Sequence, residues 1–197
     1  MELQRFYEHQ FKHVTALLRN DIDVRYRYHD LNHTLDVIEQ TQFIGKQEKL
    51  AEPELLLLRI AALFHDTGFL VKRAEHEMES IVFFEKAARS FGLSENDIAL
   101  ISGCIRATQM PQQPQSHMEQ VMCDADLDYL GRADFKSIGD LLYAEMNSCG
   151  EIGSMEDWNA LQIRFLSKHR FHTHFSKNHR QPILEQHLQA LIQQAGA

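Results

Sequence analysis

Apolar residues recur every three or four positions along almost the whole chain, and no segment keeps the two-residue alternation that is typical of a half-buried strand. Glycine and proline are scarce, with 9 and 4 among 197 residues, which disfavours a turn-rich β-sandwich. The pattern therefore predicts an all-α fold. Its helices are expected over the ranges 3–20, 31–45, 53–67, 74–91, 94–108, 118–130, 134–150, 154–166 and 182–191.

Residues that cap or end helices set these expected boundaries. Gly45 would close the second helix as a C-terminal glycine, and Gly68 would stop the third. Ser94 suits the N-cap of the fifth helix, and Pro182 suits the first turn of the last one. Residues 109–117 contain two prolines and four glutamines, so we expect them to form an exposed loop.

Charge and composition narrow the class of protein. The formal net charge is −8, from 20 Lys and Arg against 28 Asp and Glu, whereas a general nucleic-acid binder normally shows the opposite sign. Three cysteines without a C-x-x-C pair predict neither a disulfide framework nor a cysteine-based zinc site. The N-terminal residues are too polar for a signal peptide, and the most apolar stretch, 55–64, is too short to cross a bilayer. We therefore expect a cytoplasmic protein whose residues 1–197 form one helical domain.

Histidines and aspartates are the candidates for chemistry. The motifs of P-loop NTPases, dinucleotide-binding folds, serine hydrolases and zincins are absent from the sequence. By contrast, the apolar segment 55–64 ends in His65-Asp66, and burying a carboxylate is costly unless a cation or hydrogen bonds compensate. A metal ion would supply that compensation directly. His33 in an earlier helix and the acidic cluster 124–128 offer further ligands.

Four segments follow one another in an order that points to a known family. They are Tyr28-His29-Asp30-Leu31-Asn32-His33-Thr34, Ala62-Leu63-Phe64-His65-Asp66-Thr67-Gly68-Phe69, His76-Glu77-Met78-Glu79-Ser80 and Cys123-Asp124-Ala125-Asp126-Leu127. This ordered series resembles the motifs of the HD superfamily of metal-dependent phosphohydrolases, and in particular small stand-alone bacterial members. The resemblance covers roughly residues 28–131. It implies an all-α, phosphodiesterase-like HD-domain bundle, on which the C-terminal helices of residues 134–197 would pack.

The resemblance implies one divalent metal ion, held by His33, His65, Asp66 and Asp126. A nitrogen and oxygen ligand set without thiolate suits Mn²⁺, Fe²⁺, Co²⁺, Ni²⁺, Mg²⁺ or Zn²⁺. Asp66 is also implied as the catalytic residue that orients the attacking water, whose pKa the metal lowers. Asp124 lies about 200° around a helix axis from Asp126, so we expect it to be structural or a register alternative to Asp126.

Further residues are candidates for substrate binding, namely His29, Lys72, His76 and Arg106. Cations beside a metal that receives a dianion favour phosphate binding, although ordinary surface charge is the alternative for Lys72 and Arg106. Capping or packing is the alternative for His29. Thr67–Leu70 lack the acidic residue that follows the His-Asp pair in many HD enzymes acting on nucleoside monophosphates or guanosine polyphosphates.

The expected function is hydrolysis of a phosphate ester in a nucleotide or a related small phosphorylated metabolite. Two other functions stay open. One is a nucleotide-sensing HD module with little turnover, which the missing acidic residue leaves possible, and the other is a di-iron HD oxygenase, which would need a fuller set of histidines. For the four ligands themselves, the alternative is a satisfied polar network in the core, with Asp66 only capping a turn at Gly68.

Overall fold

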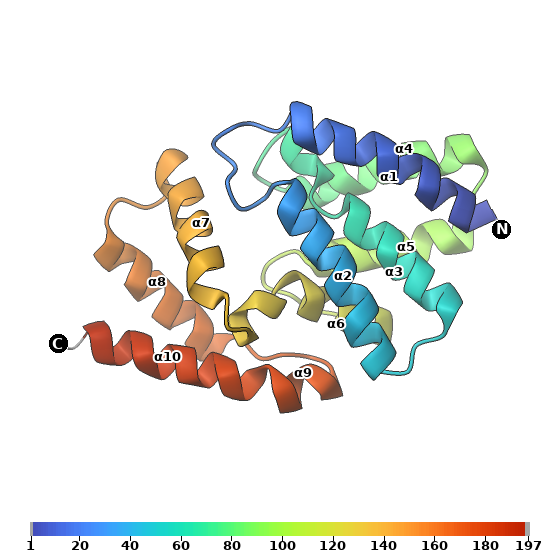
Figure 1. Ribbon diagram of the computed structural model, residues 1–197. Helices are drawn as coiled ribbons and strands as arrows, with labels where there is room; N and C mark the ends of the chain where they lie inside the picture. Colours follow the sequence, from blue (N-terminus) through green and yellow to red (C-terminus); the bar gives the residue numbers. More distant parts are fainter. Residues whose placement is uncertain (1, 196–197) are drawn as a thin grey trace. The chain divides into compact units, whose positions relative to one another are not determined.

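The computed structural model describes residues 2–195, and these residues form helices and loops without a strand (Figure 1). The all-α prediction is therefore confirmed. Packing divides the chain into two compact units. The first unit contains the residues up to Asp23 together with His29–Asp126, and the second contains Val24–Tyr28 together with the residues from Leu127 onward. That residues 134–197 pack on the motif-bearing core stays a prediction.

Each unit has its own helices, with η denoting a 3-10 helix. The first unit contains α1 (Glu2–Asn20), α2 (Leu31–Gln47), α3 (Glu52–Phe64), η1 (Thr67–Leu70), α4 (His76–Phe91), α5 (Glu95–Ala107) and α6 (His117–Asp126). The second unit contains η2 (Asp128–Gly131), α7 (Phe135–Ser148), α8 (Met155–Lys168), α9 (His174–His179) and α10 (Gln181–Ala195).

Helix α3 is the central helix of the first unit, and it packs against α1, α2, α5 and α6. Pro53 lies in its first turn, where the missing N–H has no intrahelical partner to lose. Leu58, Ile60 and Leu63 are fully buried, and each such side chain contributes about 1.5–3 kcal/mol through removal from water. The C-terminal end of α3 is therefore fixed in the core, which places the next two residues, His65 and Asp66, in the interior.

Two glycines that were expected to end helices have other roles. Gly45 lies inside α2, which continues to Gln47. A Cβ atom on Gly45 would lie 2.5 Å from Leu55 Cδ2, so this glycine lets α2 and α3 approach closely. Gly68 lies within η1 and not at the end of α3, which already ends at Phe64.

The sixth helix is shorter than the predicted range 118–130. Helix α6 ends at Asp126, and Leu127 leaves the helical conformation with φ −109° and ψ 17° before η2 begins. The apolar spacing could not show this break because Leu127 and Leu130 keep a helical separation of three residues. The break divides the acidic cluster, since Asp126 belongs to the first unit and Asp128 to the second.

The second unit has a separate apolar core. Its buried members are Tyr28, Tyr129, Leu130, Phe135, Leu166, Phe171 and Leu184. The backbone N–H of Tyr28 donates a hydrogen bond to Glu145 Oε2 at 3.0 Å, which ties the short segment Val24–Tyr28 to α7. Helix α9 was not predicted, whereas α10 begins at Gln181 and so places Pro182 in its first turn, as expected. None of the described helices has the length and apolar content that crossing a membrane requires.

Candidate metal centre

His33 is fixed in the first turn of α2. The Asp30 carboxylate caps this helix, accepting hydrogen bonds from the backbone N–H groups of Asn32 at 2.8 Å and His33 at 3.1 Å. The cap holds the start of α2 in place, and the His33 side chain is buried in the first unit. The ligand position is therefore determined by a local sequence signal, an N-cap aspartate three residues before the histidine.

His65 and Asp66 continue from the buried end of α3. The Ala62 carbonyl oxygen lies 2.8 Å from His65 Nδ1, and since a carbonyl can only accept, Nδ1 must carry the proton. In the neutral imidazole this leaves a lone pair on Nε2. His65 and Asp66 are only 1% and 4% exposed, so neither side chain relies on bulk water.

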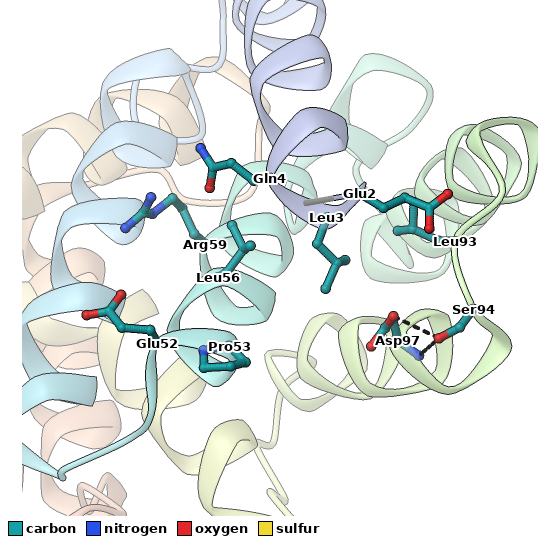
Figure 2. A pocket seen from close by; sticks show the side chains of 10 residues that line it. All are labelled: Glu2, Leu3, Gln4, Glu52, Pro53, Leu56, Arg59, Leu93, Ser94 and Asp97. Atoms are coloured by element: carbon teal, nitrogen blue, oxygen red, sulfur yellow. Dashed lines mark hydrogen bonds between the residues drawn. The ribbon is translucent and has the colours of Figure 1, made fainter.

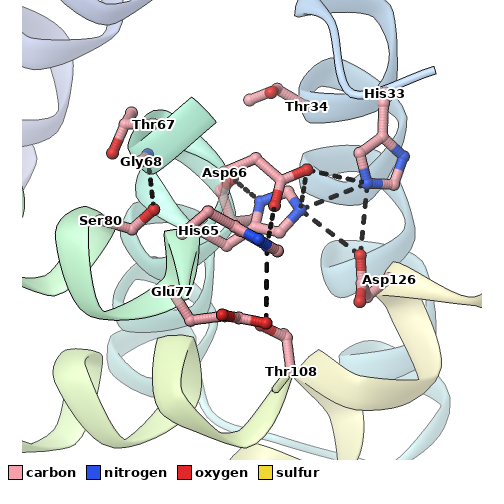
Figure 3. Close-up of polar contacts among 12 residues, drawn as sticks. His33, Thr34, His65, Asp66, Thr67, Gly68, Glu77, Ser80, Thr108 and Asp126 are labelled. Carbon is pink, nitrogen blue, oxygen red and sulfur yellow. Dashed lines mark hydrogen bonds and ion pairs between the residues drawn. The ribbon is translucent and has the colours of Figure 1, made fainter. Parts of the chain in front are cut away.

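Four ligand atoms from three separate segments converge (Figure 3). The Nε2 atoms of His33 and His65 lie 3.3 Å apart. Asp66 Oδ2 is 3.4 Å from the first of these nitrogens and 3.2 Å from the second. Asp126 Oδ1, from the end of α6, is 3.2 Å and 3.4 Å from the same two atoms. Ligands bonded to one ion at about 2.0–2.2 Å must lie within about 4 Å of each other, and these separations meet that condition.

The surroundings of Asp66 show whether a cation would fit among the four converging side chains. Its Oδ2 atom is buried and accepts no hydrogen bond, although it lies beside two imidazole nitrogens. Its side chain does not cap η1, because the N–H of Phe69 bonds to the Asp66 backbone carbonyl instead. The capping alternative for Asp66 is therefore wrong. A buried carboxylate oxygen beside two imidazole nitrogens has the chemistry of a metal ligand, and the group formed by His33, His65 and Asp66 fits a divalent ion.

The electrostatics of the cluster favour added positive charge. Burial by itself lowers the pKa of His65, but the facing Asp66 and Asp126 carboxylates outweigh it and raise this pKa well above the usual value. Burial likewise opposes ionisation of Asp126, yet the adjacent imidazoles of His33 and His65 lower its pKa to about 2. Burial opposes ionisation of Asp66 too, but the neighbouring His65 holds its pKa well below the usual value. Both aspartates are thus held as carboxylates, which is the form that binds a metal.

The segment after Asp66 brings a fifth polar group to the site. A Cβ atom on Gly68 would overlap the backbone carbonyl of His76, so only glycine permits this close approach of η1 and α4. The N–H of Gly68 donates a hydrogen bond to Ser80 Oγ at 2.8 Å, which ties the same two elements together. As a result His76 Nε2 lies 3.3 Å from Asp66 Oδ1, the second oxygen of that carboxylate.

Glu77 is a site residue that the sequence interpretation missed. Its carboxylate is largely buried, and Oε1 lies 3.6 Å from His76 Nε2. The available signal was its place within the motif segment His76-Glu77-Met78-Glu79-Ser80, where only the histidine received a role. Glu77 adds a negative charge on the side of His76 that faces the centre.

The other predicted site residues have varied surroundings. The Lys72 ammonium pairs with Glu79 at 3.0 Å and with Glu75 at 3.6 Å, so its charge is balanced locally. Arg106 Nη1 contacts Met78 Sδ at 3.3 Å on an exposed surface. Their substrate-binding roles stay predictions. Asp124 is fully buried, whereas Asp126 is the member of the acidic cluster that faces the two histidines.

A surface hollow elsewhere in the first unit does not include this centre. It has a volume of about 480 Å³ and lies where the starts of α1, α3 and α5 meet (Figure 2). Its walls include Leu3, Leu56 and Leu93, together with Arg59 and Asp97. Since none of the four converging ligands lines it, the hollow has no part in the metal chemistry.

Comparison with known proteins identifies the family to which the chain belongs. The sequence profile of the HD domain matches residues 30–128, which include all four converging ligands. The fold is similar to that in a crystal structure of a predicted HD superfamily hydrolase from an uncultured Thermotogales bacterium. That similarity has a TM-score of 0.54 at 21% sequence identity, and covers 80% of this chain and 89% of the other. No protein of curated function matches the chain. Half of the sequence, including every converging ligand, follows the HD pattern, so this chain belongs to the HD domain family.

Proposed function

We propose that this chain is a metal-dependent phosphohydrolase that cleaves a phosphate ester of a nucleotide or a related small phosphorylated metabolite. The observation that supports it best is the cluster of two imidazole nitrogens and two carboxylate oxygens, separated by 3.2–3.4 Å. Nothing in a purely structural polar network would require two carboxylates to face two imidazoles at the end of the most buried helix.

His33, His65, Asp66 and Asp126 would hold one divalent ion. When bound, such an ion lowers the pKa of a water molecule and polarises a phosphoryl oxygen. The protein keeps these ligands ready for that purpose. His65 is oriented by the Ala62 carbonyl, and His33 by the capped start of α2.

Asp66 suits the catalytic role because its two oxygens face different groups. Oδ2 lies between the nitrogens of His33 and His65, while Oδ1 lies 3.3 Å from His76 Nε2. With Oδ2 engaged as a ligand, Oδ1 can accept a hydrogen bond from the attacking water and so orient it toward phosphorus.

His29 and His76 suit the binding of the substrate phosphoryl group. Both are partly exposed, and their ring centroids lie 6.1 Å apart beside the metal ligands. An imidazole N–H can donate a hydrogen bond to a phosphoryl oxygen, and this bond strengthens as negative charge develops on that oxygen. His76 already donates its Nδ1 proton to the Arg73 carbonyl, so it would donate from Nε2 in its protonated form.

A phosphate-release screen tests the proposal. Wild-type protein is supplied with Mn²⁺, Co²⁺ or Mg²⁺ and a panel of nucleotides and sugar phosphates, beside Asp66→Ala and a control, Asp140→Ala. Asp140 is an exposed carboxylate of the second unit that pairs with Lys136. We expect turnover of at least one ester by the wild type and by Asp140→Ala, and its loss in Asp66→Ala. Absence of turnover with every metal, or full activity in Asp66→Ala, would contradict the proposal.

The same samples separate the two other functions. A nucleotide that binds the metal-loaded protein without being cleaved would favour a sensing module. Two iron atoms per chain together with oxygen uptake would favour an oxygenase. Elemental analysis of the purified protein, compared between the wild type and Asp66→Ala, therefore accompanies the screen.

A further inference from the structure

Three aromatic rings are in mutual contact beside the metal centre. The ring of Phe69 contacts the imidazoles of His29 and His76, with centroid separations of 4.2 Å and 4.1 Å and interplanar angles of 19° and 34°, and the two imidazole centroids are 6.1 Å apart. Phe69 is only 4% exposed, whereas both histidines are partly exposed. The phenyl ring is therefore a buried contact that two partly exposed imidazoles share.

The local chain geometry fixes this buried ring. Phe69 lies in η1, three residues after Asp66, and its N–H donates a hydrogen bond to the Asp66 carbonyl at 3.0 Å. The Arg73 guanidinium lies 5.7 Å from the centroid of the Phe69 ring. The Arg73 carbonyl also accepts a hydrogen bond from His76 Nδ1 at 3.1 Å, which limits rotation of that imidazole. Phe69 is thus tied to the catalytic aspartate by the backbone and to His76 by ring contact.

Both imidazoles lie beside the candidate metal ligands. His76 Nε2 lies 3.3 Å from Asp66 Oδ1, and the His29 ring lies 5.9 Å from that of His33. His29 comes from the residues just before α2, and His76 is the first residue of α4. No single helix therefore fixes the distance between the two imidazoles. Phe69 contacts both of them, and it provides that spacing.

We propose that Phe69 is a positioning residue that holds His29 and His76 at the separation needed to contact different oxygens of one phosphoryl group. This inference rests on the proposed function, because it assumes that the site accepts a phosphoryl group. An aromatic ring suits the role, because contacts between aromatic rings contribute more than the area that they bury. Phe69 itself contacts no reacting atom and acts only through the two histidines.

The matched control is Phe84, another buried phenylalanine of the first unit. Its ring contacts Phe6 at 6.2 Å and Phe64 at 5.3 Å, so it belongs to the core and not to the metal centre. Phe69→Leu and Phe84→Leu remove similar apolar volume. Both are expected to lower the melting temperature, but only Phe69→Leu should change how the site binds phosphate.

The experiment measures the binding of inorganic phosphate to the Mn²⁺-loaded protein, by the paramagnetic broadening of its ³¹P signal. We expect Phe69→Leu to weaken phosphate binding about tenfold, with the Mn²⁺ affinity changed by less than about threefold. Phe69→Tyr keeps the ring and should restore binding to nearly the wild-type level. Phe84→Leu should leave phosphate binding unchanged. If Phe69→Leu does not fold, Phe69→Met, which keeps the volume but not the flat face, takes its place.

A double-mutant cycle decides whether the effect passes through the histidines. In a His29→Asn/His76→Asn background, Phe69→Leu should have no further effect on phosphate binding. An equal loss in both backgrounds overturns the inference, and so does unchanged phosphate affinity in Phe69→Leu or the absence of any phosphate binding by the wild type. If phosphate binds and depends on Phe69 but no ester is cleaved, the proposed function fails and the positioning role stands.

Discussion

Each unit buries an aspartate just after a helix, and the two carboxylates are neutralised in different ways. Asp128 of the second unit accepts a hydrogen bond from Arg180 Nε at 2.7 Å, and Arg132 Nη1 lies 3.5 Å from its other oxygen. Among the described residues, the ion pairs of Asp66 in the first unit are with imidazoles. A guanidinium is always charged, whereas an isolated imidazole is mostly neutral at pH 7. Asp128 is therefore neutralised by arginines of its own chain, whereas Asp66 faces a group that could hold a metal ion.

A glycine makes both arrangements possible. Gly68 follows Asp66 by two residues and lets the backbone of His76 come close. Gly131 follows Asp128 by three residues, and a Cβ atom there would lie 2.7 Å from Arg180 Cα. A glycine allows the close backbone approach in both units, so the partner side chains distinguish the structural ion pair of Asp128 from the candidate metal site at Asp66.

The largest expected effect comes from Asp66→Ala, measured on activity. With one ligand and the catalytic carboxylate removed, turnover should fall by about 10³-fold or more. The rate of phosphate release from the best substrate in the screen provides the measurement, at saturating metal and substrate.

The change in melting temperature on metal removal tests the same substitution without an activity assay. A ligand that binds only the folded state raises the melting temperature, so EDTA should lower that of the wild type. Asp66→Ala should show almost no response to EDTA. An equal response in both proteins would mean that the metal binds elsewhere.

Asp128→Ala should instead affect folding. It leaves the Arg180 and Arg132 side chains without their buried carboxylate, and loss of one partner of a buried pair costs about 3–5 kcal/mol in the free energy of unfolding. Urea denaturation measures this loss, and Asp140→Ala is the control for an exposed carboxylate, with an expected change below about 0.5 kcal/mol. A stable Asp128→Ala protein would show that the two aspartates do not differ in the way described.

Gly68→Ala tests the close approach behind the metal centre. The added methyl group would overlap the His76 backbone, so η1 and α4 must separate, at a cost of about 1–3 kcal/mol in stability. His76 should also move away from Asp66, and turnover should decrease. Gly139→Ala in α7 is the control, because the nearest atom to its Cβ would be Gln162 Oε1 at 3.4 Å. Equal stability of the two variants would contradict the steric argument.

The smallest effect concerns His169 in the second unit. Burial, followed by the neighbouring charges of His172 and Arg170, lowers the pKa of His169 to about 4. Because the unfolded chain then binds more protons than the folded protein, the free energy of unfolding should fall as the pH falls from about 6.5 toward 4. Protonation of this histidine in the unfolded chain should lower the free energy of unfolding by about 1.5 kcal/mol between pH 6.5 and pH 5. His169→Leu removes it, so the stability difference between the two proteins should shrink, or reverse in favour of the variant, as the pH falls. Parallel pH profiles would contradict this.

Each unit also buries a histidine, and, as with the aspartates, the groups that surround it differ between the units. His65 faces two carboxylates, and its pKa is raised, whereas His169 packs against the rings of Phe165 and Phe171 and its pKa is lowered. The residue type alone therefore does not distinguish a site histidine from a core histidine.

Local signals were enough to predict much of the metal centre. The ordered motifs identified His33, His65, Asp66 and Asp126, and the structure brings these four together. The all-α fold was predictable because amphipathic helices have a strong local period. Their bundle type followed from the family resemblance, which the sequence profile confirms.

What could not be predicted depends on distant contacts. The close packing at Gly45 depends on Leu55 in another helix, and the break after Asp126 is hidden by apolar residues that keep helical spacing. The ammonium group of Lys72 pairs with Glu79, seven residues later, and the separation of the two residues along the sequence did not predict that their side chains would meet. Glu77 and Phe69 lie within the motif segments, but their contacts with His76 form only in the folded chain.

The segment Val24–Tyr28 belongs to the second unit although residues of the first unit flank it on both sides. A protein cut after Asp126 would therefore lose the Glu145 acceptor of the Tyr28 amide and the Tyr129 ring that packs on the Tyr28 side chain. The residues that lose these contacts lie immediately before His29 in the sequence. A protein shortened to end with the last HD motif is thus expected to be less stable than the full chain, and a domain boundary for this architecture should include both segments of the second unit.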